Sequence, residues 1–81
     1  MKIAYHPDFH KALKKFSLSI KKKFEKQALF LITSLRHPSL RAKKYDESAG
    51  TWQARVDKNI RFYFEIKGDT YILLNIKNHP K

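Results

Sequence analysis

The second half of the chain alternates between apolar and polar residues, which is the pattern of β-strands. Such runs occur at residues 51–56, at 60–67 and at about 70–76. Turn-forming residues separate them at 57–59 and at 68–69, where Gly-Asp is typical of a tight hairpin. The pattern predicts a meander of three antiparallel strands.

The first half of the chain has apolar residues at helical steps of three and four. A short helix is predicted from Pro7 to about Ser17, and a longer one, capped by Ser17 or Ser19, runs to about Arg36. It should end there because Pro38 forces the residue before it out of the helical region. The two apolar stripes are Phe9, Ala12, Leu13 and Phe16, then Ile20, Phe24, Ala28, Leu31 and Leu35.

The order of these elements predicts one α+β domain over residues 1–81, because a chain this short can bury only one core. A short strand at residues 3–5 opens it, and residues 38–50 form a basic link with an extended piece around Tyr45. The two helices form an αα-hairpin that packs on a small antiparallel sheet. With regular hairpin registers, the other face of the sheet carries Arg55, Arg61, Tyr63 and Glu65.

The net charge is +11, and nearly all of it belongs to residues 1–44. These carry 12 Lys and Arg against 2 Asp and Glu, or +10, whereas residues 45–81 carry 6 against 5, or +1. A lysine run can be a merely solvated helix face, but this excess predicts nucleic acid, a ribosome or an acidic protein as partner. The residues expected to contact RNA by charge are Lys21, Lys22, Lys23, Lys26, Lys43 and Lys44.

The sequence gives no sign of export, membrane insertion or a cofactor. It has no cysteine, no apparent signal peptide and no apolar run of about 18 residues, so we expect a soluble cytoplasmic protein. His6 and His10 have the i,i+4 spacing of a metal site. Because His6 precedes the predicted helix and no third ligand is evident, no metal is expected.

The stretch from Gly50 onward resembles the second half of RelE/ParE-superfamily toxins from bacterial toxin–antitoxin systems. These toxins typically show a tryptophan, an Arg-Val pair, a short turn, an apolar residue with arginine, a β-hairpin and a histidine near the end of the last strand. The matching residues here are Trp52, Arg55, Val56, Ile60, Arg61 and His79. The predicted strand, helix hairpin and proline-containing link fit too, so the resemblance covers nearly the whole chain.

The resemblance implies a RelE/ParE-like toxin fold and, as in the best-known members, cleavage of messenger RNA on the ribosome. Arg55 and Arg61 would stabilise charge on the scissile phosphate, because a guanidinium can hold two phosphate oxygens. His79 would act as general acid or base. The alternative is that the arginines are strand-surface residues paired with Asp57 or Glu65 and that His79 is an ordinary surface histidine.

Two departures from the family pattern bear on the chemistry. Several ribonucleolytic relatives continue past this histidine with a tyrosine or a further helix, whereas only Pro80 and Lys81 follow His79 here. The carboxylate base that some members carry before the tryptophan has no obvious counterpart. The base is therefore unassigned, with Glu65 and Lys43 as candidates.

Two aromatic residues near the arginines have different expected roles. Tyr63 shares a strand face with Arg61 and would either stack on an RNA base or lie as an amphipathic residue at the sheet edge. Trp52 is expected in the core.

Three functions are compatible with the sequence. The first is a toxin that is an endoribonuclease (an mRNA interferase), the second a ParE-like non-enzymatic inhibitor of DNA gyrase, and the third a non-toxic nucleic-acid-binding module. The arginine pair and the histidine favour the first, while the missing tyrosine and base keep the second open. Either toxin hypothesis implies a cognate antitoxin, encoded nearby, whose acidic segment folds on binding.

Overall fold

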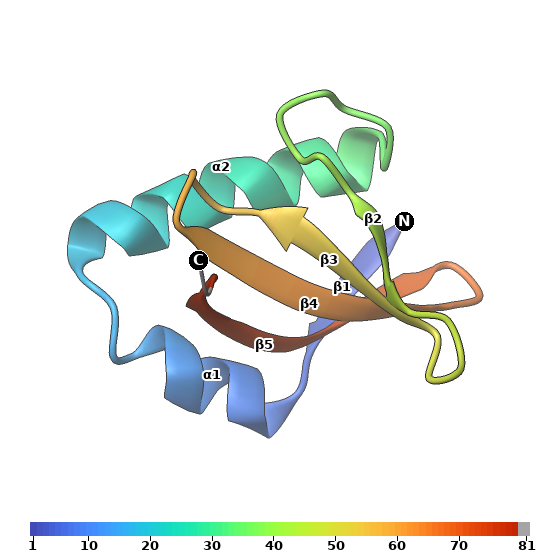
Figure 1. Ribbon diagram of the computed structural model, residues 1–81, viewed down its shortest axis with the longest axis horizontal. Helices are drawn as coiled ribbons and strands as arrows, with labels where there is room; N and C mark the ends of the chain where they lie inside the picture. Colours follow the sequence, from blue (N-terminus) through green and yellow to red (C-terminus); the bar gives the residue numbers. More distant parts are fainter. Residues whose placement is uncertain (80–81) are drawn as a thin grey trace.

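The computed structural model describes residues 1–79 and contains two helices and five strands (Figure 1). In chain order these are β1 (Lys2–Tyr5), α1 (Pro7–Leu13), α2 (Leu18–Thr33), β2 (Lys43–Asp46), β3 (Thr51–Arg55), β4 (Ile60–Lys67) and β5 (Thr70–Asn78). The predicted α+β fold, a helix hairpin on a small sheet, is confirmed. Pro80 and Lys81, which follow His79, lie outside the described residues.

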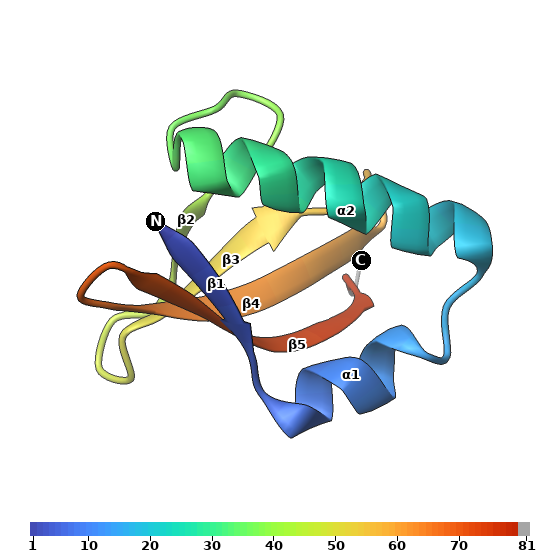
Figure 2. The same cartoon turned by 180° about the vertical axis from the view of Figure 1, so that it is seen from behind.

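All five strands form one sheet in the order β1-β5-β4-β3-β2. The predicted meander is its centre, and β2 adds an antiparallel strand at one edge. The expectation of a wholly antiparallel sheet is wrong, because β1 runs parallel to β5 at the other edge. The helix hairpin carries the chain from one end of β1 across the sheet, and a crossover of this kind allows parallel pairing (Figure 2).

The two helices and one face of the sheet enclose a single core. The ring of Phe9 in α1 lies 5.0 Å from that of Phe24 in α2, and Phe24 meets Phe62 of β4 edge-on at 5.5 Å. The buried apolar residues are Phe9, Phe24, Ala28, Leu31, Leu40, Ala54, Val56, Ile60, Phe62, Phe64, Tyr71, Leu73 and Ile76. The remaining predicted stripe residues are partly buried and pack against this set.

The helix boundaries differ from the prediction at their carboxyl ends. α2 begins as expected, with the Ser17 hydroxyl accepting a hydrogen bond from a first-turn amide at 3.3 Å. It ends at Thr33, before Arg36, because Ser34 adopts an extended conformation and its hydroxyl accepts from the Arg36 amide at 3.2 Å. α1 likewise stops at Leu13. Neither helix of residues 1–79 is long and apolar enough to cross a membrane.

The strand registers decide which side chains share a face. β3 and β4 pair regularly, with Arg55 opposite Arg61, so the predicted face is confirmed. Between β4 and β5 the register shifts after Tyr63, which leaves one extra residue in β5. This bulge explains how Leu73 and Ile76, three positions apart, both point into the core.

Candidate functional site

The sheet face turned away from the helices carries a cationic cluster next to the turn between β3 and β4. Arg55 of β3 and Arg61 of β4 are direct cross-strand partners and are both partly exposed. Like charges in such a pair repel each other. Partial burial, together with the charges of Arg41 and Arg61, lowers the pKa of Arg55 from its usual value.

These arginines line an open hollow of about 280 Å³ that brings the three predicted catalytic residues together. We call it the arginine pocket, and its lining residues are Arg41, Lys43, Gln53, Arg55, Arg61 and His79. Among residues 1–79, no carboxylate lines it. Across residues 1–79, the three ion pairs of side chains all lie elsewhere and leave these arginines uncompensated. A pocket of this composition is suited to an anion.

The guanidinium of Arg61 is fixed by backbone groups. Its Nη1 donates to the carbonyl oxygens of Asp57 at 2.8 Å and Ile60 at 3.2 Å. The Asp57 carboxylate accepts instead from the amides of Asn59 and Ile60, and it lies 3.6 Å from the Lys23 ammonium. The alternative of Arg61 paired with the Asp57 carboxylate is therefore not what the structure shows, and Arg61 keeps its full charge for a ligand.

His79 reaches the arginine pocket because it follows β5, the neighbour of β4. Its backbone amide donates to the Asn59 carbonyl at 2.7 Å, which ties it to the turn between β3 and β4. Its side chain is exposed and lines the pocket. The position agrees with the proposed proton transfer, which stays a prediction.

Of the two candidate bases, only Lys43 lies at the arginine pocket. Glu65 pairs with Thr51, four residues along β4 from Arg61. At roughly 3.3 Å per residue, their Cα atoms are about 13 Å apart. A general base needs hydrogen-bond reach of its proton, so the structure removes Glu65 from consideration.

The predicted stacking residue Tyr63 is not accessible in this arrangement. It is only 5% exposed, and it lies on a central strand, not at the edge. Lys77 Nζ lies 5.0 Å above its ring, and the ring of Tyr45 meets it edge-on at 4.9 Å. Tyr45, which the sequence placed only in a basic link, is 57% exposed and is the accessible ring of this face.

The six lysines predicted to contact RNA lie in two places. Lys43 lines the arginine pocket, and Lys44 lies over the ring of Trp52, 5.9 Å from its centroid. The other four are on α2, which packs on the opposite face of the sheet, and they are Lys21, Lys22, Lys23 and Lys26. All but Lys21 are well exposed. The α2 lysines thus form a separate basic surface.

Sequence reasoning missed Arg41 and Gln53. Arg41 has a positive φ of 46°, which residues with side chains seldom adopt. Its neighbour Leu40 is fixed by a hydrogen bond to its carbonyl from the Arg55 amide at 2.8 Å. Gln53 is buried, and within residues 1–79 its Oε1 has no hydrogen-bond partner. The charge of the link indicated Arg41 as basic, but no pattern indicated its conformation.

The structure gives His6 a local role. It caps α1, and its Nδ1 accepts from the Asp8 amide at 3.1 Å. In the part of the chain that the structure describes, no three His, Asp or Glu side chains come together as a metal site would require.

No model of a known protein family matches the chain, and no curated protein matches it in sequence. Solved structures do share its architecture. The RelB-RelE antitoxin-toxin complex from Methanococcus jannaschii matches with a TM-score of 0.77 and 23% identity, over 93% of this chain and 88% of that one. The YoeB/ParE toxin from Agrobacterium tumefaciens matches with a TM-score of 0.78 and 13% identity, over 99% of this chain and 100% of that one.

YafQ from E. coli matches with a TM-score of 0.74 and 17% identity, over 96% of this chain and 92% of that one. Identities this low establish likeness of fold. The arrangement of helices and strands therefore confirms the fold that the sequence resemblance predicted: this chain has the RelE/ParE-like toxin fold.

Proposed function

We propose that the protein is the toxin of a toxin–antitoxin pair and acts as an endoribonuclease on ribosome-bound mRNA. The observation that carries this is the arginine pocket, in which five of the six lining side chains are Arg, Lys or His and, among residues 1–79, none is acidic. A phosphodiester supplies the missing negative charge. Exposed Tyr45, on the same sheet face, offers a ring for an unstacked base.

The proposed reaction is attack of the RNA 2′-hydroxyl on its neighbouring phosphate. A 2′,3′-cyclic phosphate forms and the bond from phosphorus to the 5′ oxygen breaks. Arg55 and Arg61 would hold the non-bridging oxygens, where charge grows in the transition state. His79 would give a proton to the leaving 5′ oxygen, and Lys43 or a water would accept the proton of the 2′-hydroxyl.

We also infer an antitoxin as partner. The matched structure from M. jannaschii is an antitoxin-toxin complex, and a further match is a complex of DinJ with YafQ from E. coli. On this chain, an apolar groove of about 490 Å³ lies between β1 and α2, and it is lined by Ile3, Tyr5, Phe24, Glu25, Ala28, Leu29 and Ile32. Leu29 and Ile32 are 65% and 41% exposed. The groove fits the apolar side of an amphipathic segment whose acidic side meets the α2 lysines.

Replacing Arg61 tests the ribonuclease proposal. Arg61→Ala should lower cleavage by about 100- to 1000-fold with ribosome binding largely kept, because the guanidinium acts mainly in the transition state. Arg61→Lys should restore only part of the cleavage rate, since the point charge of an ammonium cannot reproduce the two-point hydrogen bonding of a guanidinium. Cleavage is mapped by primer extension in a translating extract. Lys67→Ala, at the far end of β4, removes the same charge and should cleave normally.

The same preparations would be run in a gyrase supercoiling assay. If the wild type leaves mRNA intact but inhibits supercoiling, the ribonuclease proposal falls and the ParE-like function takes its place. Full cleavage by both Arg61→Ala and His79→Gln would show that the arginine pocket is not the catalytic site.

A further inference from the structure

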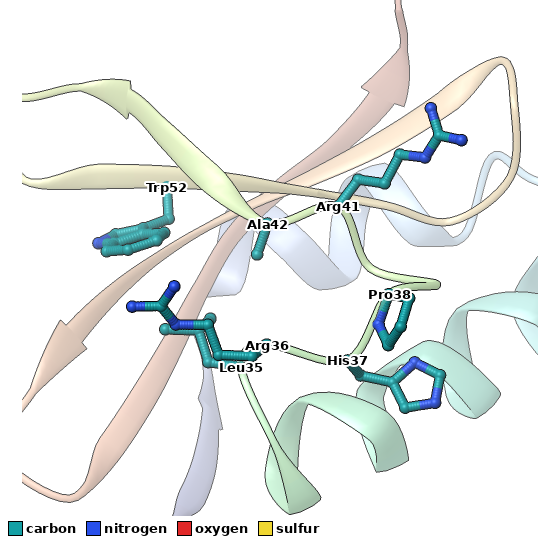
Figure 3. A pocket seen from close by; sticks show the side chains of 7 residues that line it. All are labelled: Leu35, Arg36, His37, Pro38, Arg41, Ala42 and Trp52. Carbon is teal, nitrogen blue, oxygen red and sulfur yellow. The ribbon is translucent and has the colours of Figure 1, made fainter.

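A second hollow lies beside the arginine pocket, on the side of Trp52 (Figure 3). We call it the Trp52 hollow. It measures about 230 Å³ and is lined by Leu35, Arg36, His37, Pro38, Arg41, Ala42 and Trp52. It is formed where the link after α2 passes the start of β3. Arg41 borders both hollows.

The indole of Trp52 forms an aromatic wall of this hollow. The sequence placed Trp52 in the core, but it is only partly buried at the core margin. It stacks on the buried ring of Phe64 at 6.2 Å between centroids and 20° between planes. Its position is thus held from within. The ring is otherwise partly exposed, and the Lys44 ammonium lies 5.9 Å from its centroid, so a stacked base would take the place of this ammonium.

The cationic side of the hollow is Arg36. Figure 3 shows its side chain extending toward the indole, whereas the side chain of Arg41 points away from it. Arg36 is exposed, and among residues 1–79 its guanidinium takes part in no ion pair. His37 completes the wall in a fixed orientation, because it stacks flat on Phe30 at 3.8 Å and its Nδ1 accepts from the Ser39 amide.

We propose that the Trp52 hollow binds one nucleotide of single-stranded RNA, with the base on the indole and a phosphate on Arg36. An aromatic face beside a free guanidinium, with no carboxylate lining the site, matches the two parts of a nucleotide. Arg41 separates this hollow from the arginine pocket, so the same strand can occupy both. The inference rests on the proposed ribonuclease function and adds a subsite beside the scissile phosphate.

Trp52 is the only tryptophan of the chain, so its fluorescence reports on this hollow alone. Titration with a short 2′-O-methyl uridine oligonucleotide, which cannot be cleaved, should quench the emission in a saturable way. An abasic oligonucleotide of equal length should bind without quenching. Arg36→Ala should weaken binding about tenfold, as expected for a lost charge-assisted hydrogen bond, and Lys67→Ala should do so much less.

Binding of the oligonucleotide would be followed independently by fluorescence anisotropy of an attached dye. Binding without any change in Trp52 emission would overturn the proposal, and so would equal losses in Arg36→Ala and Lys67→Ala. Quenching of Trp52 by poly-glutamate, but not by the oligonucleotide, would overturn the proposal and indicate a site for acidic protein. Primer extension distinguishes failure of the subsite proposal from failure of the ribonuclease proposal. Quenching without cleavage would contradict the ribonuclease function but support nucleotide binding at the Trp52 hollow. Cleavage without quenching would contradict only the subsite.

Discussion

Arg41 keeps a strained backbone conformation at the point where the two hollows meet. Left-handed residues with side chains cost on the order of 1 kcal/mol, and such strain is commonly kept where a ligand needs it. A glycine would adopt this φ freely. The side chain, not the backbone, therefore explains why an arginine stands here.

Arg41→Gly should separate stability from activity. Relative to Arg41→Ala, it should raise the free energy of unfolding by about 0.5 to 1 kcal/mol, because glycine removes the strain and alanine does not. Both variants lack the guanidinium and should cleave mRNA less than the wild type. Urea denaturation and primer extension provide the two measurements. Equal stability of the two variants would show that position 41 is not strained in solution.

Three tyrosines limit the stability of the protein at high pH: Tyr63 and Tyr71 are buried, and Tyr5 is 42% exposed. Burial raises the pKa of Tyr5, Tyr63 and Tyr71 above the usual value of 10.0. In the unfolded chain these phenols ionise first, so the stability that is present below about pH 10 falls as the pH rises toward the folded pKa values. The free energy of unfolding, measured by urea denaturation across this range, should decline.

Tyr63→Phe should make that decline shallower, because one of the three phenols is then absent. Absorbance of tyrosinate during an alkaline titration follows the ionisation directly. A free energy of unfolding that stays constant from about pH 8 to pH 11 would contradict the burial of these hydroxyls.

At the scale of elements, Gln27 connects α2 to the strand that carries Arg55. Its Nε2 donates to the carbonyls of Ser39 at 3.0 Å and Arg55 at 2.8 Å, and its Oε1 accepts from the Ser39 hydroxyl at 2.9 Å. The residue is buried. The helix, the link and the end of β3 are thus held together by one polar side chain.

Gln27→Leu should lower the free energy of unfolding by about 1 to 3 kcal/mol, since it removes the donor of two partly buried hydrogen bonds, to the carbonyls of Ser39 and Arg55. Gln53→Leu is the matched control. It removes a buried oxygen that has no partner, so its effect should be near zero or stabilising. Urea denaturation compares the two. Similar losses in both variants would mean that the volume or shape of leucine, not hydrogen bonding, decides the result.

Elements defined by local pattern were predictable, and those defined by distant pairing were not. The hairpins of β3, β4 and β5 follow from alternation and turn residues that are close in sequence. β1 pairs with β5 across nearly the whole chain, and four-residue β2 has no apolar alternation, so neither pairing leaves a local pattern. The bulge in β5 is hidden for the same reason, because it depends on packing against α1.

The same division holds for the candidate site. The arginine face followed from strand alternation, and the family resemblance indicated His79. The burial of Tyr63 depends on Lys77 and Tyr45, which come from other strands, so its own sequence neighbours could not reveal it. The hollow beside Trp52 likewise depends on the path of the link after α2.

On the scale of the whole molecule, positive charge lies on both sides of the sheet. The arginine pocket is on the open face, and the α2 lysines are on the helix-covered side. A ribosome presents RNA over a wide surface and can contact both the arginine pocket and the α2 lysines. A single RNA strand bound in the arginine pocket cannot also reach the α2 lysines. The two surfaces should therefore make separable contributions to binding and cleavage.

Replacing Lys21, Lys22, Lys23 and Lys26 together by Gln should weaken ribosome binding and flatten its salt dependence. Each phosphate contact contributes about 0.9 to the slope of log affinity against log salt, so lost contacts appear directly in that slope. Cosedimentation with ribosomes at several salt concentrations measures it. Replacing Lys2, Lys11, Lys14 and Lys67 by Gln changes the net charge equally. If both sets flatten the slope alike, the α2 lysines are not a specific contact.

The strand order has a consequence for synthesis of the protein. β5 lies between β1 and β4, so β1 has no neighbour in the sheet until β5 has left the ribosome. A nascent chain that lacks β5 cannot close the sheet, and α1, which packs along β5, has nothing to cover. His79, held to the turn before β4, reaches the arginines last of all. The arginine pocket is therefore completed only after β5 has left the ribosome, although most of its lining residues are made earlier.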